Sequence, residues 1–446
     1  MWQGQLPYRI RELHDKYGTV VRTGPDELSF THEDAWKDIY SKRESSRPYQ
    51  WHGKLPGVDA HTLVSAPAPD HARFRKAFSP GFSEKSVRSQ EPLITQYIDK
   101  LMTILRQESK QSEERGIAVK LAEWINFTTF DIMGDLGWGA SFDCLRTRTY
   151  HPWILVVLWY KGLLLGVTLK FYPILGALLA LITPSSAQAG VKMVVETSRE
   201  NVTERLTKSS ERPDLMSSII RHNEVDRQHL ISKDEMISNS STIIVAGSDP
   251  LASVVAGALT YLIGKPEAMA RLESEIRSSF QSEKDITTES TKKLPYLQAV
   301  LLETLRLCPP VPDSMRRVTP KDGATVAGYF VPGGTVVGVT AYAAFRAAST
   351  FPSPDELSPE RWLRSNSGVQ EYPGFHPFGF GPRSCAGQAL AWAEMRLLLT
   401  RLIWNFDIRD TKAGTVRPWI SQRIYWTWQR DAMQVSLQPS SSVARV

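Results

Sequence analysis

The spacing of apolar positions along the chain predicts a protein built mainly of α-helices. Apolar residues recur at three- and four-residue intervals in a first helix at Leu6–Tyr17, and this periodicity returns from about residue 70 to residue 310. Polar stretches near 107–117, 208–213 and 279–293 interrupt the second region, and they predict connections between helices.

The β part of the chain is small. Two β-branched runs on either side of Gly24-Pro25 predict a hairpin, and short strands are expected near 324–341 and at the end of the chain. Residues 44–70 are rich in Pro, Gly and Ser and predict a long loop. With a strong helix expected at about 388–404, the pattern predicts a mainly α fold with a small β region.

The most apolar stretch runs from Pro152 to Ile182. Lys161, Lys170 and Pro173 divide it into pieces shorter than the ~20 apolar residues that cross a bilayer. It predicts two apolar helices, which either pack in the core or dip one surface into a membrane.

Composition excludes several classes of protein. The chain has 446 residues, 42% hydrophobic and 22% charged, which is typical of globular proteins. Lys and Arg exceed Asp and Glu by 53 to 47 without a long basic run, so no nucleic-acid partner is predicted, while an acidic partner or an anionic membrane surface stays open. Three cysteines, Cys144, Cys308 and Cys385, are too few for a disulfide framework and indicate a reducing compartment.

One short segment carries candidate chemistry: residues 378–387 read FGFGPRSCAG. Its glycines and proline impose an irregular turn whose backbone can approach a flat ligand closely. A predicted helix follows at once, so Cys385 lies at a helix N-terminus, where the dipole favours thiolate over thiol. Such a thiolate suits axial ligation of haem iron, and Arg383 can meet a haem propionate. For the cysteine taken alone, a structural role in a turn is the alternative.

The segment matches the pattern F-x-x-G-x-R-x-C-x-G at every fixed position, from Phe378 to Gly387. By this pattern the chain resembles the cytochrome P450 family of haem-thiolate monooxygenases, and two further segments are similar to fungal microsomal members of secondary metabolism. The resemblance implies a single catalytic domain over residues 1–446, folded as a triangular prism of helices around haem b. It also implies Cys385 as the axial ligand of the iron.

A second family motif lies on the predicted helix Pro295–Leu307. Glu303 and Arg306 are three residues apart on one face of this helix, where side chains can pair. The family's E-x-x-R motif buries such a pair with an arginine from a P-E-R loop, and Arg361 occupies that position here. The resemblance implies a structural triad that positions the cysteine loop.

Basic residues in two more segments resemble the family's propionate ligands. His71 and Arg75 are four residues apart, so they lie one above the other on a helix. A solvated basic helix is the alternative for this pair. Arg317 matches the next propionate arginine, and the adjacent Arg316 could take that role instead. With Arg383, these residues are the expected propionate ligands.

Residues Ile231–Lys265 are similar to the family's long helix across the distal haem face. Ala246, Gly247 and Asp249 match the A-G-x-D/E-T pattern, and Pro250 replaces the threonine. The resemblance implies that Gly247 leaves room for dioxygen and that Asp249 supplies protons through water. Pro250 lacks an N–H and leaves the Ala246 carbonyl without its helical donor. Either that carbonyl or a substrate hydroxyl holds the water, or oxygen activation is weakened.

The activity implied by the resemblance is insertion of one oxygen atom into a hydrophobic small molecule, with electrons from an NADPH-dependent cytochrome P450 reductase. The rivals are a haem-thiolate enzyme without net oxygen insertion (phenol coupling, ring closure, dehydration or isomerisation), which Pro250 favours, and a non-catalytic binder of haem or a hydrophobic ligand. Apolar substrate contacts are expected at Val245, Ala246, Val311 and Ile420. They belong to a wider set of expected substrate segments: 50–65, 152–182, 243–251, 310–316 and 419–424.

Microsomal members of the family lie on the cytosolic face of the endoplasmic reticulum behind an N-terminal anchor. This chain begins where such an anchor would end, so the anchor is expected to be missing. Contact with the membrane surface is then expected through residues 152–182.

Overall fold

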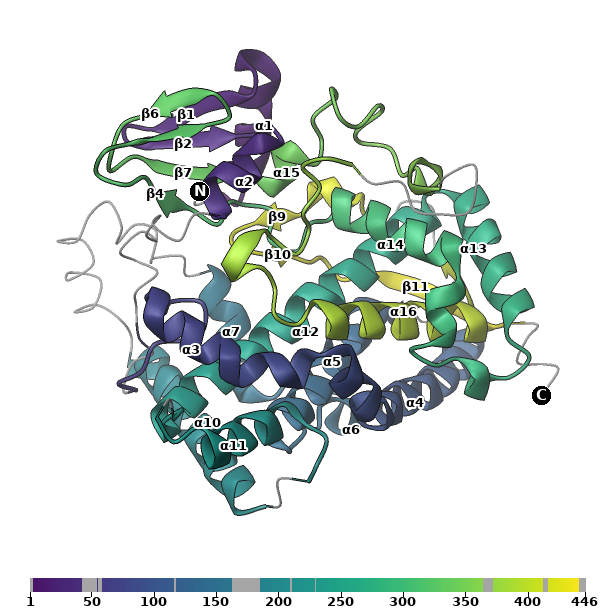
Figure 1. Ribbon diagram of the computed structural model, residues 1–446. Helices are drawn as coiled ribbons and strands as arrows, with labels where there is room; N and C mark the ends of the chain where they lie inside the picture. Colours follow the sequence, from purple (N-terminus) through teal and green to yellow (C-terminus); the bar gives the residue numbers. More distant parts are fainter. Residues whose placement is uncertain are drawn as a thin grey trace.

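A computed structural model describes residues 3–41, 54, 58–115, 118–162, 185–208, 211–228, 230–363, 372–411 and 416–440. The mainly α fold with a small β region is confirmed (Figure 1). The α-helices are α1 (Leu6–Tyr17), α2 (Asp34–Tyr40), α3 (Ala68–Phe78), α4 (Glu84–Arg115), α5 (Leu121–Trp138), α6 (Cys144–Thr147), α7 (Pro152–Gly162), α10 (Ser185–Thr207), α11 (Leu215–Val225), α12 (Lys233–Ile263), α13 (Pro266–Ser279), α14 (Pro295–Leu307), α15 (Ala341–Ala344) and α16 (Gln388–Asn405).

Short strands and 3₁₀ turns connect the helices. The strands are β1 (Val20–Gly24), β2 (Glu27–Phe30), β3 (Val119–Lys120), β4 (Arg317–Val318), β5 (Ala324–Val326), β6 (Tyr329–Val331), β7 (Val336–Val339), β8 (Phe406–Asp410), β9 (Arg423–Ile424), β10 (Trp428–Gln429) and β11 (Gln434–Pro439). The 3₁₀ turns are η2 (Ser79–Phe82), η3 (Glu283–Asp285), η4 (Ser290–Lys293), η5 (Pro359–Trp362), η6 (Gly381–Arg383) and η7 (Trp419–Ser421).

The largest sheet joins the two ends of the sequence. Its strand order is β1-β2-β7-β4, with β2 parallel to β7 and the other pairs antiparallel. Phe30 pairs with Val339, so the N-terminal hairpin is held by residues about three hundred positions away. One face of this sheet packs with α2, and the sheet stands at one corner of the molecule in Figure 1. A second sheet has the order β3-β11-β8, and β5–β6 and β9–β10 form two-stranded ribbons.

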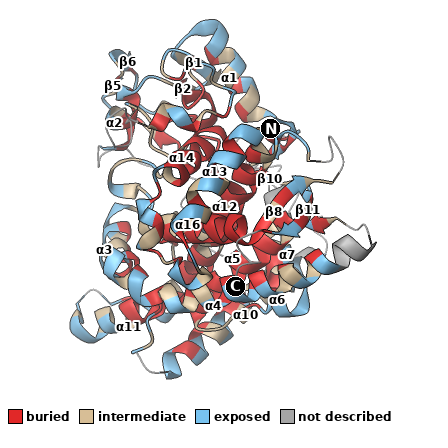
Figure 2. Cartoon of the chain, turned by 90° about the vertical axis from the view of Figure 1, so that its right-hand side faces the viewer, coloured by how far each residue is buried: buried red, intermediate tan, exposed pale blue. Residues whose placement is uncertain are grey.

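Helix α12 runs through the centre of the helical part (Figure 1), where it contacts α5, α10, α14 and α16. A capping box begins it: Ser232 accepts a hydrogen bond from the Glu235 N–H, and the Glu235 side chain accepts one from the Ser232 N–H. Among the described helices, α12 alone is long and apolar enough to cross a bilayer, but 72% of its most apolar window is buried within the protein. Figure 2 accordingly shows it among the buried elements, so it is a core helix.

Small residues bring α12 close to α5. A Cβ atom at Gly137 would lie 2.9 Å from the Ile244 side chain, and one at Gly247 would lie 2.6 Å from the Met133 side chain. Both separations are shorter than real Cβ contacts, so the glycines permit the approach of the two helices.

Most of the elements expected from the sequence are confirmed, and one connection is wrong. The first helix, the hairpin, the connections near 208–213 and 279–293, and the helices at 295–307 and 388–404 are all present. The polar stretch near 107–117 is no connection, because α4 continues through it to Arg115. Its Gln, Glu, Lys and Arg residues are strong helix formers, which outweighs the absence of an apolar face. Of the apolar stretch 152–182, the structure describes α7, while residues 163–184 lie outside the described part.

A buried carboxylate ties α14 to η5. Arg306 bonds Glu303 through two nitrogens, at 2.8 and 2.9 Å, and both side chains are fully buried. The Arg361 Nε lies 3.1 Å from Glu303 Oε1, the Trp362 Nε1–H donates to Oε2 at 2.8 Å, and the Ser358 N–H donates to Oε1 at 2.9 Å. Burial alone would raise the pKa of Glu303, but Arg306 and Arg361 lower it, so the carboxylate is held ionised.

Replacing Glu303 by glutamine should destabilise the protein strongly. The amide keeps the size of the side chain but leaves two buried guanidinium groups without their counter-ion, which costs about 3–5 kcal/mol in the free energy of unfolding. Urea denaturation of the holoenzyme measures this loss. Glu360→Gln is the matched control, because Glu360 lies on the same η5 turn and makes an exposed ion pair with Arg271. The control should lose less than ~1 kcal/mol; equal losses would contradict the account.

A second buried carboxylate has no such partner. Glu394 of α16 is 1% exposed, and its Oε2 accepts no hydrogen bond from the described residues. Burial raises the pKa of Glu394 to about 8. The folded protein therefore holds a proton at neutral pH that the unfolded chain releases.

This shift predicts a pH-dependent effect of Glu394→Gln. The folded pKa of about 8 is above the ordinary value of 4.5, so the stability from the protonated carboxyl is complete below pH 4.5 and is lost as pH rises toward 8. Glutamine removes the titration. The variant should therefore gain stability relative to wild type between pH 5 and 8, by an amount on the order of a few kcal/mol. Urea unfolding across this range measures it, and a difference that does not change with pH would show that Glu394 does not titrate.

Candidate functional site

The cysteine loop is an irregular turn between η6 and α16. Gly379 and Gly381 have φ values of +76° and +74°, which strongly favour glycine. A Cβ atom at Gly381 would lie 2.3 Å from the main-chain oxygen of Tyr40, so the loop also requires glycine for its approach to α2. The Cys385 N–H donates to the Phe378 carbonyl at 2.8 Å, and this bond closes the turn. The Phe378 ring packs against Trp392 of α16.

Cys385 differs from the other two cysteines in its surroundings. Cys144 and Cys308 are buried, whereas solvent reaches Cys385. Protein atoms enclose the sulfur on its other sides, so burial raises the pKa of the thiol, and the Gly387 N–H and Arg75 offset this only in part. The start of α16 lowers the pKa of the thiol as expected, through the Gly387 N–H, but this effect is smaller than that of burial. Loss of the proton requires a bound cation such as a metal ion.

Helix α3 brings basic side chains to this loop. The Arg75 Nη1–H donates to the Ser384 carbonyl at 3.0 Å, one residue before the cysteine. His71 is buried one turn earlier on the same face of α3. The structure therefore brings Arg75 to the loop and buries His71, so this face of α3 is packed and is not the solvated helix of the alternative.

Two more arginines lie beside the loop with no carboxylate partner among the described residues. The Arg383 Nη2–H donates to the Ala66 carbonyl at 2.7 Å, and its Nη1 is buried without a hydrogen-bond partner. The Arg317 Nη1 donates to the carbonyls of Met315 and Arg316. Burial lowers the pKa of Arg317, and burial together with the charge of Arg317 lowers the pKa of Arg383 to about 10. Buried like charges of this kind are stabilised by an anion.

The structure distinguishes Arg317 from its neighbour Arg316. Arg316 pairs with Asp313 at 2.9 Å and with Glu27 at 2.6 Å, so carboxylates of the chain already neutralise it. Arg317 contacts only carbonyl groups and the ring of Tyr40. Of the two candidates for a propionate ligand, Arg317 is the one that retains an uncompensated charge.

These residues fit haem. An accessible thiol lies on a rigid loop, and Arg75, Arg317 and Arg383 supply positive charge from three segments around it. The buried Nη1 of Arg383 still needs an acceptor, which a propionate oxygen would provide. The donors are those required by a planar ligand with an iron centre and two carboxylates.

Helix α12 presents one uncovered face at its centre. Ala246 is exposed, and Val245 and Pro250 are partly exposed, in a helix that is otherwise largely buried. Ala246 and Pro250 are four residues apart and therefore share this face. Gly247 instead faces Met133 of α5. Its missing side chain permits this packing, and the expected room for dioxygen beside Gly247 stays a prediction.

Asp249 is buried and paired with a residue that the sequence did not single out. The Arg430 Nη2 lies 3.1 Å from Asp249 Oδ1, and the Arg430 Nη1–H donates to the Asp249 carbonyl at 2.9 Å. Arg430 follows β10 and comes 181 residues after Asp249 in the sequence. No local pattern could have connected the two residues, because the contact depends on how the C-terminal segment packs.

The expected substrate residues lie on three elements. Val245 and Ala246 are on the uncovered face of α12, and Ile420 is exposed on η7, which contacts α12. Val311 is half-buried between α14 and β4. Much of the expected loop 50–65 lies outside the described residues.

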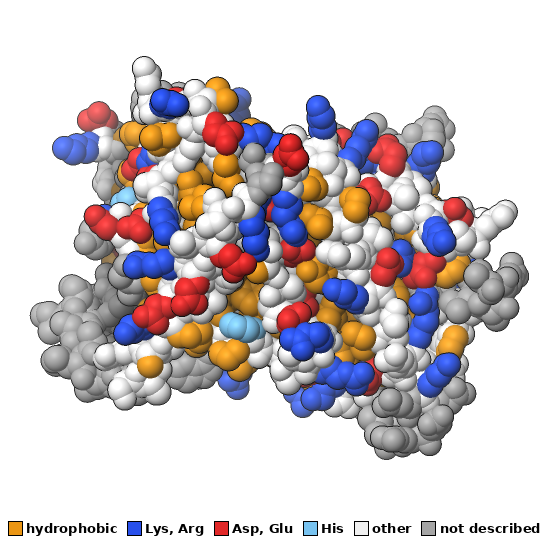
Figure 3. Space-filling model, turned by 90° about the horizontal axis from the view of Figure 1, so that it is seen from below, with side chains coloured by type: hydrophobic (Ala, Val, Ile, Leu, Met, Phe, Trp, Pro, Cys, Tyr) orange, Lys and Arg blue, Asp and Glu red, His pale blue; other side chains and the backbone are white. Residues whose placement is uncertain are grey.

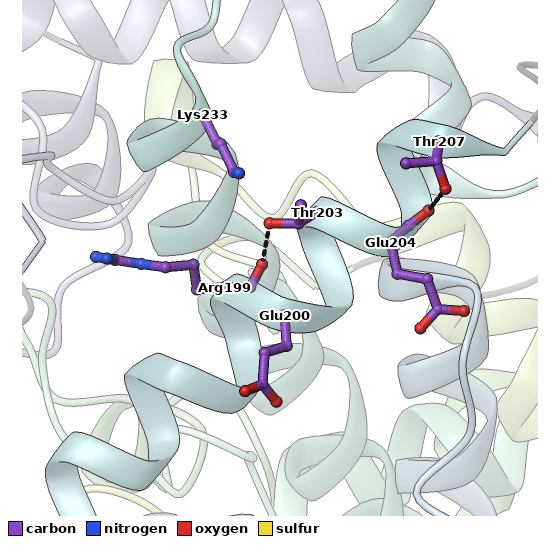
Figure 4. A pocket seen from close by; sticks show the side chains of 6 residues that line it. All are labelled: Arg199, Glu200, Thr203, Glu204, Thr207 and Lys233. Carbon is purple, nitrogen blue, oxygen red and sulfur yellow. Dashed lines mark hydrogen bonds between the residues drawn. The ribbon is translucent and has the colours of Figure 1, made fainter.

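A separate surface hollow of about 560 Å³ contains none of the expected residues. It is lined by Arg199, Glu200, Thr203, Glu204, Thr207 and Lys233, from α10 and the start of α12 (Figure 4). The carboxylates of Glu200 and Glu204 point away from Lys233 in this view. We assign no chemistry to it.

Replacing Arg383 by methionine should loosen haem. If Arg383 binds a propionate as expected, the variant loses a charged hydrogen bond to it, so haem transfer to excess apomyoglobin should accelerate roughly tenfold. Absorbance in the Soret region follows the transfer. Arg396→Met is the matched control, because Arg396 is also a half-buried arginine near the loop, but it bonds Gln298 and lies over Trp392. Equal transfer rates for the two variants would show that Arg383 does not hold haem.

Comparison with known proteins agrees with this geometry. The family model for cytochrome P450 matches residues 2–427. The cytochrome P450 monooxygenase aclL of Aspergillus oryzae is 38% identical over 98% of this chain and 89% of that protein. The monooxygenase astJ of the same fungus is 36% identical over 98% and 87%, and averantin hydroxylase of Dothistroma septosporum is 34% identical over 98% and 82%.

Family membership also identifies the cofactor as haem with an axial cysteine thiolate. The mainly helical fold and the basic residues around an accessible thiol are consistent with it. The chain belongs to the cytochrome P450 family of haem-thiolate monooxygenases.

Proposed function

We propose that Cys385 is the thiolate ligand of haem b in this protein, and that the protein inserts one oxygen atom into a hydrophobic secondary metabolite. The observation that carries the proposal is the position of Cys385, the accessible cysteine on a loop lined by arginines without carboxylate partners. Bound haem supplies dioxygen activation, and electron donation from the thiolate favours O–O cleavage.

The chain's own residues hold the cofactor in place. His71, Arg75, Arg317 and Arg383 bind the propionates, each from a buried or half-buried position. The turn from Phe378 to Gly387 fixes the direction of the sulfur through the Cys385 N–H bond and the contacts around the two glycines. The Glu303, Arg306 and Arg361 triad keeps the segment before this loop attached to α14.

On the side of the proposed haem site opposite the cysteine loop, residues of α12 transfer protons. Asp249 takes up a proton at its carboxylate and releases it to water. Pro250 has no N–H, so the Ala246 carbonyl lacks its helical donor and can accept a hydrogen bond from water or from a substrate hydroxyl. The exposed position of Ala246 on the uncovered face of the helix supports this use.

The proposed substrate is a hydrophobic small molecule. Val245, Ala246, Val311 and Ile420 are apolar and at least partly exposed, and they offer contacts by burial of nonpolar surface. One relative is named for the hydroxylation of averantin, which supports hydroxylation of a secondary metabolite as the reaction class.

Electrons are proposed to come from NADPH-cytochrome P450 reductase docked on the cysteine side. Next to α3, which contacts the cysteine loop, lies a groove of about 1070 Å³. Its charged side chains are mostly basic: Lys76, Lys85, Arg221 and Arg227, with Asp226. Such a surface favours an acidic partner. Basic and acidic side chains are intermixed over the lower face in Figure 3, which gives no basis for nucleic-acid binding there.

We also propose a position at the cytosolic face of the endoplasmic reticulum membrane. Large apolar side chains are exposed on α7, at Leu155, and on β6, at Tyr329 and Phe330. Side chains of this kind suit insertion into a membrane surface.

Pro250 supports a second candidate, a haem-thiolate reaction without net oxygen insertion. Where the family pattern has a threonine hydroxyl, this chain has a ring without a hydrogen-bonding group. Phenol coupling, ring closure, dehydration or isomerisation would place less demand on proton delivery at this position.

Oxygen-18 labelling separates the two candidates. The metabolite that accumulates in a strain lacking this gene is incubated with holoenzyme, reductase, NADPH and oxygen-18 gas. Monooxygenation predicts an NADPH-dependent product with one labelled oxygen atom, measured by mass spectrometry. A product without label would favour the second candidate. Absence of any reductase-driven product from this metabolite would contradict the proposed function.

A further inference from the structure

Arg430, in the C-terminal segment, contacts Asp249 of α12 at two points. Its guanidinium pairs with the Asp249 carboxylate at 3.1 Å and donates to the Asp249 main-chain carbonyl at 2.9 Å. It also donates to the Ser253 hydroxyl, which itself donates to the same carbonyl at 2.9 Å. The side chains of Arg430 and Asp249 are only 10% and 2% exposed.

The sequence of α12 explains why a contact from outside the helix matters for Asp249. Pro250 has neither an N–H nor a hydroxyl, so the residue next to Asp249 cannot help to orient it. The ring also excludes a normal helical bond to the Ala246 carbonyl, which weakens the helix at this turn. Arg430 contacts the acid from outside the helix and can contribute to its orientation.

The pair lies between the core and the solvent. Tyr150 is near enough that its pKa, raised mainly by burial, is lowered by Arg430 and raised by Glu123 and Asp249. The Tyr150 hydroxyl accepts a hydrogen bond from Asn126 at 3.0 Å. Because Asp249 is almost fully buried and Arg430 is partly exposed, the arginine is the polar link from the acid toward solvent.

We propose that Arg430 is a positioning residue for proton delivery, in place of the threonine that α12 lacks. Its planar guanidinium group contacts the Asp249 carboxylate and the Asp249 main-chain carbonyl at once. A single ammonium group could not do this with the same geometry. The guanidinium also places a positive charge beside the carboxylate that is proposed to pass a proton to water. The inference rests on the proposed role of Asp249. The rival explanation is a clamp that only stabilises the turn at Pro250.

Proton-dependent kinetics separate these explanations without a known substrate. Holoenzyme and reductase consume NADPH, and the rate is measured in water and in heavy water. For Arg430→Gln, we expect a roughly tenfold slower rate and a larger solvent isotope effect than in wild type, because proton delivery becomes limiting. Arg430→Lys should have a rate and an isotope effect between those of wild type and Arg430→Gln, because lysine keeps the charge but lacks the planar guanidinium group.

Two controls identify structural damage. Oxidation of guaiacol driven by hydrogen peroxide bypasses the reductase, and it should stay within about twofold of wild type in Arg430→Gln. Arg277→Gln is the matched variant, because Arg277 also combines carboxylate pairs, with Asp407 at 2.7 Å and Glu273 at 3.9 Å, with hydrogen bonds to the carbonyls of Ile403 and Phe406. It should leave NADPH consumption and its isotope effect unchanged.

A double-mutant cycle tests the contact independently of turnover. Urea unfolding of the holoenzyme is compared for Asp249→Asn, Arg430→Gln and the double variant. The two changes should be coupled by about tenfold in the unfolding equilibrium constant. Additive effects would overturn the proposal.

Two kinetic outcomes would also overturn it. One is a wild-type rate and isotope effect in Arg430→Gln. The other is an equal loss of NADPH-driven and peroxide-driven turnover, which would indicate a clamp. If wild-type holoenzyme consumes no NADPH with reductase, the proposed function fails instead, and the unfolding cycle still decides whether the two groups act together.

Discussion

Arg317, which is buried, and Arg383, which is half-buried in the cysteine loop, have no carboxylate partner among the described residues. This uncompensated charge is the constraint that the site must satisfy. Burial lowers the pKa of both Arg317 and Arg383, and they repel each other. A folded protein retains such charges when an anion offsets them. In the proposed arrangement, a haem would offset them with its two propionates, and Cys385 would bind its iron at the same place. Binding of the cofactor and stability of the loop are thus parts of one electrostatic arrangement.

The rest of the fold keeps that loop in place. Glu303 concentrates five hydrogen bonds from four residues at one point, and so links α14 to the segment before the loop. On the other side, α12 can face a ligand because its glycine at 247 lets it pack closely on α5. The same helix contains a proline where the family has threonine, and Arg430 contacts it there. Among the motifs compared with the family patterns, the departure lies at this turn of α12.

Local spacing is what the sequence could reveal, and it predicted most of the residues of the proposed site. The cysteine pattern, the pair at 303 and 306, and the pair at 71 and 75 depend on neighbours within one turn or loop, so they were predictable. The raised pKa of Cys385, the contact of Gly247 with α5 and the role of Arg430 depend on segments that meet only after folding. The choice between Arg316 and Arg317 was open for the same reason, since it depends on Glu27 in β2. The helix through residues 107–115 is different. Helix propensity alone would have predicted it, whereas the polarity of the stretch led to the wrong prediction of a connection.

The central claim is that Cys385 bonds the iron, and the absorption spectrum of reduced, carbon-monoxide-bound protein tests it most directly. Wild type and the variants Cys144→Ser and Cys308→Ser should show the strongly red-shifted Soret band of thiolate-ligated haem, because these two thiols are buried elsewhere. Cys385→Ser should lose that band. A wild-type spectrum in Cys385→Ser, with haem bound, would contradict the account.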